Sequence, residues 1–142
     1  MKLFILLALS ILASPLAAQQ NEDSAVRVPL ENYFRGHATG DPAYFRKAFL
    51  PEARLFWIKD GQMTTVSSEE FIQRAGSGHP QPDESQRKRS IEHVDVSGNA
   101  ATAQLLLDYP DARITDFMSL LKVNGEWKIV NKIFFVESKK KL

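Results

Sequence analysis

The chain has 142 residues, a length typical of one domain, and its 18 Lys and Arg residues are balanced by 17 Asp and Glu residues. This near-neutral balance excludes the basic surface of a nucleic-acid-binding domain, so we expect no nucleic-acid partner. The chain has no cysteine, which excludes disulfides, thiol chemistry and cysteine-bound metals, and its stability must come from an apolar core.

The first 18 residues, MKLFILLALSILASPLAA, have the layout of a secretory signal peptide. Lys2 precedes an apolar run from Leu3 to Ala13, and Pro15 and small residues follow. The run is shorter than the roughly 20 apolar residues of a membrane span, which disfavours the alternative of a retained anchor. We therefore predict a signal peptide over residues 1–18, export to the periplasm or the extracellular space, and no membrane attachment after cleavage.

Two helices are predicted next. Residues 19–24 are polar and are expected to be disordered. Apolar residues recur at helical spacing over residues 25–37 and predict the first helix. Asp41 and Pro42 are an N-cap and a first-turn proline for the second helix, which Pro51 ends.

The middle of the chain predicts a β-hairpin, a short helix and a loop. Residues 55–58 and 63–66 are strand-like and flank an Asp-Gly turn dipeptide. Ser67 and Glu70 have the spacing of a capping box at the start of a helix. Glycine, proline and charged residues over 76–86 predict a loop.

The remainder predicts four strands. Residues 88–96 form the first, with a bulge expected near His93 because alternation breaks there, and residues 101–109 form the second. Residues 115–135 form a hairpin around Asn124-Gly125. Helices early in the chain and antiparallel strands later favour an α+β fold.

Two registers of this last hairpin are open. A two-residue turn pairs Val123 with Glu126 and places Asp116 on the apolar face of the second strand. A three-residue loop places Asp116 directly across from Lys132, away from that face. We favour the second register, because it pairs opposite charges and keeps a carboxylate out of an apolar layer, and it makes Asp116 a structural partner of Lys132.

Four segments of the chain, in this order of elements, resemble the nuclear-transport-factor-2-like superfamily. They are YFRGHATGDPAYFRKAF, PEARLFW, HVDVSGNAATAQL and TDFMSLLKVNGEWKIVNKIFF. The likeness is strongest to the branch known as the putative lumazine-binding family, near the polyketide-cyclase-like proteins. It implies a domain over residues 25–137, and the sequence SKKKL after it predicts a basic tail over 138–142.

The resemblance also implies an architecture. It is a cone in which a strongly bent antiparallel sheet wraps around the N-terminal helices, as in cystatin-like folds, with an apolar cavity at the open end. Many members form homodimers through the outer sheet face. Isomerases, cyclases, dehydratases and binding domains share this fold, so the resemblance alone does not define a function.

Candidate site residues follow from both arguments. In either register Asn131 shares the apolar face of the last strand, which makes it the best polar cavity residue; the alternative is a hydrogen-bonded core amide. Tyr33 resembles the helix-one tyrosine of ketosteroid isomerases, which donates to the substrate oxygen; the alternative is an ordinary core tyrosine. Trp57 stands where those isomerases carry their catalytic carboxylate. It cannot act as a base and instead offers a flat apolar wall.

Three hypotheses result. The favoured one is a domain that binds a small, flat, apolar or aromatic molecule, with Tyr33 and Asn131 orienting it between walls of Leu55, Trp57, Trp127 and Ile129. The second is a cofactor-free lyase or isomerase, with Tyr33 as oxyanion donor and His93 or Asp116 as the acid–base group.

The third hypothesis is a dimeric interaction module without a ligand. In the favoured register its outer face carries Met118, Leu120, Val130, Phe134 and Val136. The three histidines are not at metal-ligand spacing and no phosphate-binding or nucleophile motif occurs, so we expect neither a metal nor a cofactor.

Overall fold

The computed structural model describes residues 15–139, with side chains from residue 21 onward. Most of the predicted signal peptide and the last residues of the basic tail, 140–142, lie outside the described residues. The helices are α1 (Pro15–Thr39), α2 (Pro42–Ala48), α3 (Ser68–Ala75) and a 3-10 turn, η1 (Glu84–Gln86). The strands are β1 (Phe49–Lys59), β2 (Gln62–Ser67), β3 (Lys88–Ser97), β4 (Ala100–Asp108), β5 (Ala112–Val123) and β6 (Glu126–Ser138).

Helix α1 begins earlier than the sequence indicates. Residues 19–24, which were expected to be disordered, are helical. Glu22 explains why this polar segment is ordered, because its carboxylate accepts hydrogen bonds from Lys122 Nζ at 2.6 Å and Trp127 Nε1 at 3.1 Å. Within residues 15–139, none of the helices combines the length and apolar character needed to cross a membrane.

The predicted caps of the two shorter helices are confirmed. The Asp41 carboxylate accepts from the backbone N–H of Ala43 at 2.8 Å at the start of α2. Ser67 and Glu70 form the capping box of α3, in which the Glu70 carboxylate accepts from the Ser67 N–H at 2.8 Å. These caps satisfy backbone N–H groups at the starts of α2 and α3 and so fix where the two helices begin.

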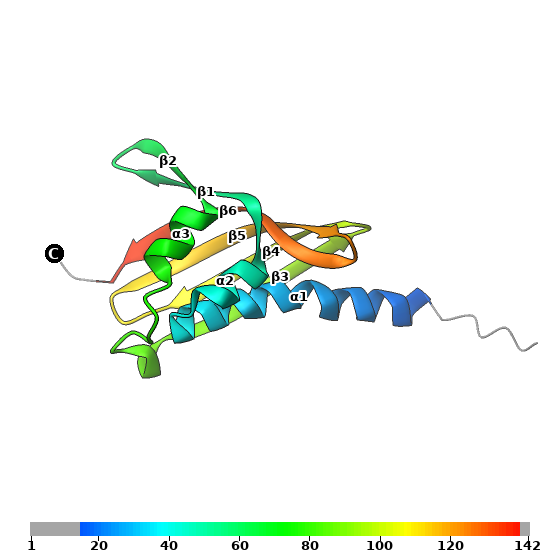
Figure 1. Ribbon diagram of the computed structural model, residues 1–142, viewed down its shortest axis with the longest axis horizontal. Helices are drawn as coiled ribbons and strands as arrows, with labels where there is room; N and C mark the ends of the chain where they lie inside the picture. Colours follow the sequence, from blue (N-terminus) through cyan, green and yellow to red (C-terminus); the bar gives the residue numbers. More distant parts are fainter. Residues whose placement is uncertain (1–14, 140–142) are drawn as a thin grey trace, which may run out of the picture.

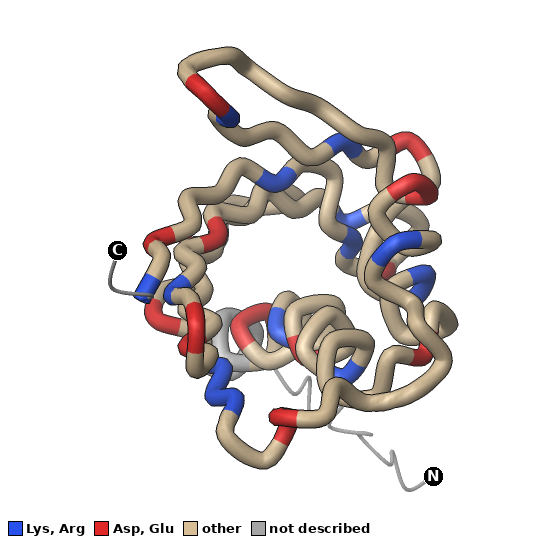
Figure 2. The backbone as a smooth tube through the Cα atoms, turned by 90° about the vertical axis from the view of Figure 1, so that its left-hand side faces the viewer, with Lys and Arg blue, Asp and Glu red and all other residues tan. Residues whose placement is uncertain are grey.

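The six strands form one sheet in the order β2-β1-β6-β5-β4-β3. Neighbouring strands are antiparallel except β1 and β6, which are parallel, so the sheet is mixed where a wholly antiparallel one was predicted. The sheet bends over α1 (Figure 1), and the view along the molecule shows it as an arc around the helices (Figure 2). The fold is therefore the predicted α+β cone.

The hairpin between β5 and β6 has a register that neither prediction described completely. The turn at Asn124-Gly125 has two residues, both with positive φ, and Val123 pairs with Glu126, so the favoured three-residue loop is wrong. The register then shifts by one residue at Val130, between the pairs of Ser119 with Asn131 and of Leu120 with Ile129. This β-bulge reverses the alternation of all later side chains in β6.

The bulge decides which side chains of β6 enter the cone. Trp127 and Ile129, before it, point inward, and Lys132, after it, is also buried at 4% exposure. Asn131 and Ile133 point to the outer face instead. The predicted position of Asn131 inside the cone is therefore wrong.

The predicted dimer face is wrong in its residues, because the two-residue turn places Met118 and Leu120 opposite inward-facing residues of β6 and the bulge turns Phe134 inward. Met118 and Leu120 are buried on the inner face, and Phe134 faces the interior of the cone. The outer face instead presents Phe117, Ile133 and Phe135, which are 45%, 50% and 68% exposed.

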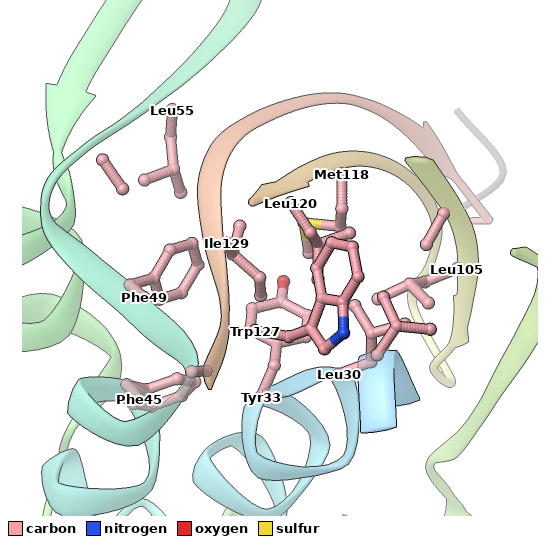
Figure 3. Close-up of a cluster of buried hydrophobic side chains, with 14 of the residues drawn as sticks. Leu30, Tyr33, Phe45, Phe49, Leu55, Leu105, Met118, Leu120, Trp127 and Ile129 are labelled. Carbon is pink, nitrogen blue, oxygen red and sulfur yellow. The ribbon is translucent and has the colours of Figure 1, made fainter. Parts of the chain in front are cut away.

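The core lies between α1 and the concave face of the sheet. Tyr33, Leu30 and Ile129 are fully buried there. Figure 3 shows Tyr33 and Leu30 of α1 facing Ile129, Leu120 and Leu105 of the sheet. Phe45, Phe49 and Leu55 pack on the other side of β6 (Figure 3). This packing fixes α1, and with it Tyr33, against β5 and β6.

Candidate functional site

A cavity of about 180 Å³ lies inside the cone between α1, α3 and the sheet. The helices line it with Tyr33, His37, Phe71 and Arg74. The sheet contributes mainly apolar side chains, among them Leu55 and Trp57 of β1, together with Lys132 and Phe134 of β6. The Trp57 and Phe134 rings stack with their centroids 5.2 Å apart and form one wall. The enclosure is thus mostly aromatic, with a few polar groups.

Three buried polar side chains form a network at the base of this cavity. Tyr33 Oη donates to Asp116 Oδ2 at 2.7 Å and accepts from Lys132 Nζ at 2.6 Å. Lys132 Nζ also lies 2.8 Å from Asp116 Oδ1, as an ion pair without an aligned hydrogen bond. Asp116 is 0% exposed and pairs through its backbone with Leu105 and Phe134, so it lies behind Tyr33 and Lys132.

Burial controls the protonation of this network. It raises the pKa of Tyr33 well above its ordinary value, and the neighbouring Asp116 carboxylate raises it further, so the phenol stays neutral. Burial also lowers the pKa of Lys132, against the opposing attraction of Asp116. The rings of Tyr33, Phe71 and Phe134 surround Nζ, with centroids 5.0, 5.5 and 4.5 Å away. These aromatic faces favour a cation at that point.

His37 supplies a second polar group to the cavity wall. Its ring packs edge-on against Tyr33 and Phe45, at centroid distances of 4.6 and 5.1 Å. Burial lowers the pKa of His37 well below its ordinary value, and the positive charge of Lys132 adds to this, so the imidazole is neutral near pH 7. Its Nε2 atom is buried and has no hydrogen-bond partner among the described residues. Such an atom is costly unless something binds to it.

Only part of the predicted site comes together. Tyr33, Leu55 and Trp57 line the cavity as predicted. Ile129 is fully buried in the core, and Trp127 lies beside the middle of α1, where it lines a separate hollow with Pro29 and Gly125. Neither Trp127 nor Ile129 is therefore a wall of the cavity.

Two predicted polar residues lie on the other side of the sheet. The bulge expected near His93 is confirmed between Ile91 and His93, and it leaves His93 exposed on the outer face. His93 and Asn131 both line a shallow outer groove of about 250 Å³, together with Gln104. His93 cannot serve as a base for a molecule in the cone, because the sheet separates the two.

Asp116 has the partner that was predicted but not the predicted surroundings. It forms the expected ion pair with Lys132, yet both groups are buried on the inner face. The Tyr33 proton is already donated to Asp116, so Tyr33 can act as an oxyanion donor only by giving up that bond.

Sequence reasoning missed three polar residues of the cavity: His37, Arg74 and Lys132. Lys132 was predicted to lie with Asp116 on the face away from the apolar side chains, because the favoured register paired the two charges there. The available signal was the pairing of Asp116 with Lys132 in one hairpin, which required both to share a face. Arg74 follows Phe71 by three residues on α3, so the two belong to one helical face.

Comparisons with known proteins agree with this architecture. Residues 21–135 match the family model described as "Putative lumazine-binding". Among characterised proteins, Aldolase FrzH from Cladobotryum sp is 24% identical over 122 residues, which cover 80% of this chain and 90% of the aldolase.

Solved structures match over most of the chain. A crystal structure of a nuclear-transport-factor-2-like protein of unknown function from Shewanella baltica has 30% sequence identity and a TM-score of 0.75, and the match covers 83% of this chain and 95% of that one. A similar protein of unknown function from Silicibacter pomeroyi has 22% identity and a TM-score of 0.73, over 84% of this chain and 98% of that one. The second likeness concerns the fold alone.

Proposed function

The chain belongs to the putative lumazine-binding family of nuclear-transport-factor-2-like proteins, and from that premise we propose that its cone cavity binds one small, flat, largely apolar molecule. The family fold is that of a small-molecule-binding or isomerase-like domain. The observation that carries the proposal is the buried, unpartnered His37 Nε2 on the wall of an otherwise aromatic cavity. Binding sites for small molecules combine apolar walls with a few convergent polar groups in this way.

The volume of the cavity limits the size of the ligand. An engineered cavity of about 150 Å³ in another protein holds benzene. A cavity of about 180 Å³ therefore suits a single substituted ring and is too small for a sterol. The exposed Arg74 at the rim is placed to meet an anionic substituent, and His37 Nε2 can bond a polar ring atom. An aromatic acid or a small heterocycle matches this chemistry.

The two tryptophans of the chain allow a test, because Trp57 lines the cavity, and also the neighbouring outer groove, whereas Trp127 lines neither. Single-ring aromatic acids, phenols and heterocycles are screened by thermal shift, and hits are titrated into Trp127→Phe and Trp57→Phe. We expect a hit to change the fluorescence of Trp127→Phe, in which Trp57 is the only reporter, and to leave that of Trp57→Phe nearly unchanged. At 100 times its dissociation constant it adds about 2.7 kcal/mol to the free energy of unfolding.

A sterol serves as the oversize control in the same screen. A fluorescence change that follows Trp127, or a sterol that binds as well as the single rings, contradicts binding in the cone. If no compound in the panel binds, the dimeric interaction module without a ligand becomes the favoured hypothesis.

A second candidate function is a cofactor-free lyase or isomerase. It is supported by the buried Tyr33–Asp116 hydrogen bond beside the cavity and by the similarity to an aldolase over 90% of that protein. In this version Tyr33 bonds the substrate oxygen after releasing the carboxylate, and Asp116, which lies behind Tyr33 and Lys132, exchanges protons with the substrate through them. A bound carbonyl compound that exchanges its α-hydrogen with deuterated water in the wild type only, and not in Asp116→Asn, distinguishes this candidate from plain binding.

We also propose that the protein forms a homodimer through its outer sheet face. An apolar groove of about 360 Å³ there is lined by Phe56, Ile58, Met63, Phe117, Ile133 and Phe135, among others. Ile58 and Met63 are 68% and 71% exposed, and a contiguous patch of this kind on a soluble domain marks an interaction site.

We expect Ile133→Glu to convert a dimer into a monomer, because it places a charge in the middle of the groove. Light scattering coupled to size-exclusion chromatography measures the mass. Val123→Glu, at the exposed hairpin turn and outside the groove, is the matched control and should remain dimeric. A monomeric wild type at micromolar concentration removes the dimer from the proposal.

Export is part of the same proposal and is supported by the sequence of residues 1–18. Cleavage after Ala18 would remove only the beginning of α1 and would leave Glu22 with its partners Lys122 and Trp127. Sequencing the N-terminus of the protein from fractionated cells tests it, and an intact Met1 in the cytoplasm would contradict it.

A further inference from the structure

We propose that Lys132 is a nucleophile that forms an imine with a small aldehyde or ketone entering the cone cavity. The inference rests on the proposed function, in that the cavity must admit a small molecule. It goes beyond that function by assigning covalent chemistry to a residue that plain binding does not use.

The position of Lys132 sets it apart from the other lysines. It is the only buried lysine among residues 21–139, and it lines the cavity with the rings that surround its ammonium group. Lys128, four residues earlier on β6, lies outside the cavity and donates to the Lys47 carbonyl at 2.9 Å. A carbonyl compound inside the cone would therefore meet one amine.

A purely structural ion pair accounts poorly for this arrangement. Taking both charges out of water costs more than their attraction returns unless the geometry is good and the other hydrogen bonds are made. Here Asp116 Oδ1 lies 2.8 Å from Nζ but accepts no aligned hydrogen bond. That oxygen can take a proton from Nζ once the ammonium group rotates to direct an N–H bond at it. Burial, which disfavours the ammonium form, works in the same direction.

The chemistry balances with the groups present. A proton passes from Lys132 Nζ to Asp116 Oδ1, and the freed lone pair attacks the carbonyl carbon. As the C–N bond forms and the C=O π bond breaks, one N–H proton moves from this nitrogen to the former carbonyl oxygen. The resulting carbinolamine loses its hydroxyl group as water when Asp116 returns the proton. The sum is one ammonium plus one carbonyl compound giving one protonated imine plus one water, with no oxidant or reductant.

The surroundings suit both ends of this reaction. Tyr33 Oη lies 2.6 Å from Nζ and is placed to hydrogen-bond the oxygen of the carbinolamine. The protonated imine keeps the positive charge of the ammonium, so the rings of Phe71 and Phe134 that now surround Nζ would face the new cation. The volume of about 180 Å³ limits the substrate class to compounds of about one ring, such as an aryl aldehyde.

Reductive trapping tests the inference. The full chain is incubated near pH 7 with benzaldehyde and cyanoborohydride, which reduces an imine to a stable secondary amine, and the modified lysines are mapped by peptide mass spectrometry. We expect benzylation of Lys132 in preference to Lys128, the internal reference on the same strand. Lys132→Arg, which keeps the charge and cannot form an imine, should lose the major adduct.

A competitor keeps the test valid if Lys132→Arg fails to fold. Benzyl alcohol has the same ring and cannot form an imine, so in the wild type it should suppress labelling of Lys132 and leave Lys128 unchanged. Labelling of surface lysines without Lys132, while benzyl alcohol raises the melting temperature, overturns the imine and preserves the binding cavity. If benzyl alcohol does not bind and Lys132 is not labelled, both the inference and the cavity proposal fail.

Discussion

Replacing Asp116 with alanine is expected to destabilise the protein by about 3–5 kcal/mol, because it leaves the buried Lys132 ammonium without its counter-charge. Asp116 is 0% exposed and Lys132 is 4% exposed, so water cannot replace the lost partner. Tyr33 Oη also loses its acceptor, at a cost of about 1–3 kcal/mol for a buried polar group. Chemical denaturation of the wild type and Asp116→Ala measures the difference. A loss below about 1 kcal/mol would contradict a buried, coupled network.

The matched control removes the whole network. Asp116→Leu, Lys132→Met and Tyr33→Phe together replace each polar group by an apolar one of similar size. Replacing a buried ionic network by well-packed apolar residues is often neutral or stabilising, so we expect the triple variant to be more stable than Asp116→Ala. It should still bind apolar rings, and benzaldehyde should label only its surface lysines, without the major adduct of the wild type. That combination separates the network's role in chemistry from its role in folding.

Gly40→Ala is expected to cost about 2–5 kcal/mol, the sum of a left-handed backbone and a steric clash. Gly40 ends α1 with φ of +70°, and a Cβ there would lie 2.2 Å from the carbonyl oxygen of His79. Gly40 also receives the loop after α3, since its carbonyl accepts from the Gly78 N–H at 2.9 Å. The substitution therefore pushes that loop away from the end of α1.

Gly61→Ala is the control for the backbone term. Gly61 also has a positive φ, of 76°, but a Cβ there would meet nothing within 4 Å. It should cost only the conformational penalty of about 1–2 kcal/mol. Thermal or chemical unfolding of both variants isolates the clash as their difference. Equal losses would mean that the loop yields freely at His79.

Local signals predicted the elements well because their causes lie within a few residues. Asp41 caps α2, Ser67 and Glu70 cap α3, and the broken alternation near His93 marks a real bulge. The parallel pairing of β1 with β6 has no such signal. It joins segments more than 70 residues apart, and only the closure of the sheet around the helices brings them together.

The inner face of β6 could not be predicted from its composition. In the segment KIVNKIFF both phases of alternation mix apolar and polar side chains, so the composition does not reveal the bulge at Val130, which places Asn131 outside and Lys132 inside. The sequence correctly predicted the contact of Asp116 with Lys132 but placed the pair on the outer face, whereas it is buried on the inner face. The prediction judged the carboxylate as if it were alone, whereas Tyr33, 83 residues earlier in the chain, supplies the hydrogen bond that permits its burial.

Because of the extra residue at Val130, the shape of the cavity and the chemistry of its side chains can be changed by separate mutations. Deleting Val130 would straighten β6 and relax the local bend, yet Ile129 and Lys132 would keep their inward directions, because regular alternation would resume across the join. Substituting position 132 would do the reverse, changing the reactive group without altering the curvature. A deletion at position 130 could thus change the shape of the cavity, and a substitution at position 132 could change its reactive group, each without the other effect.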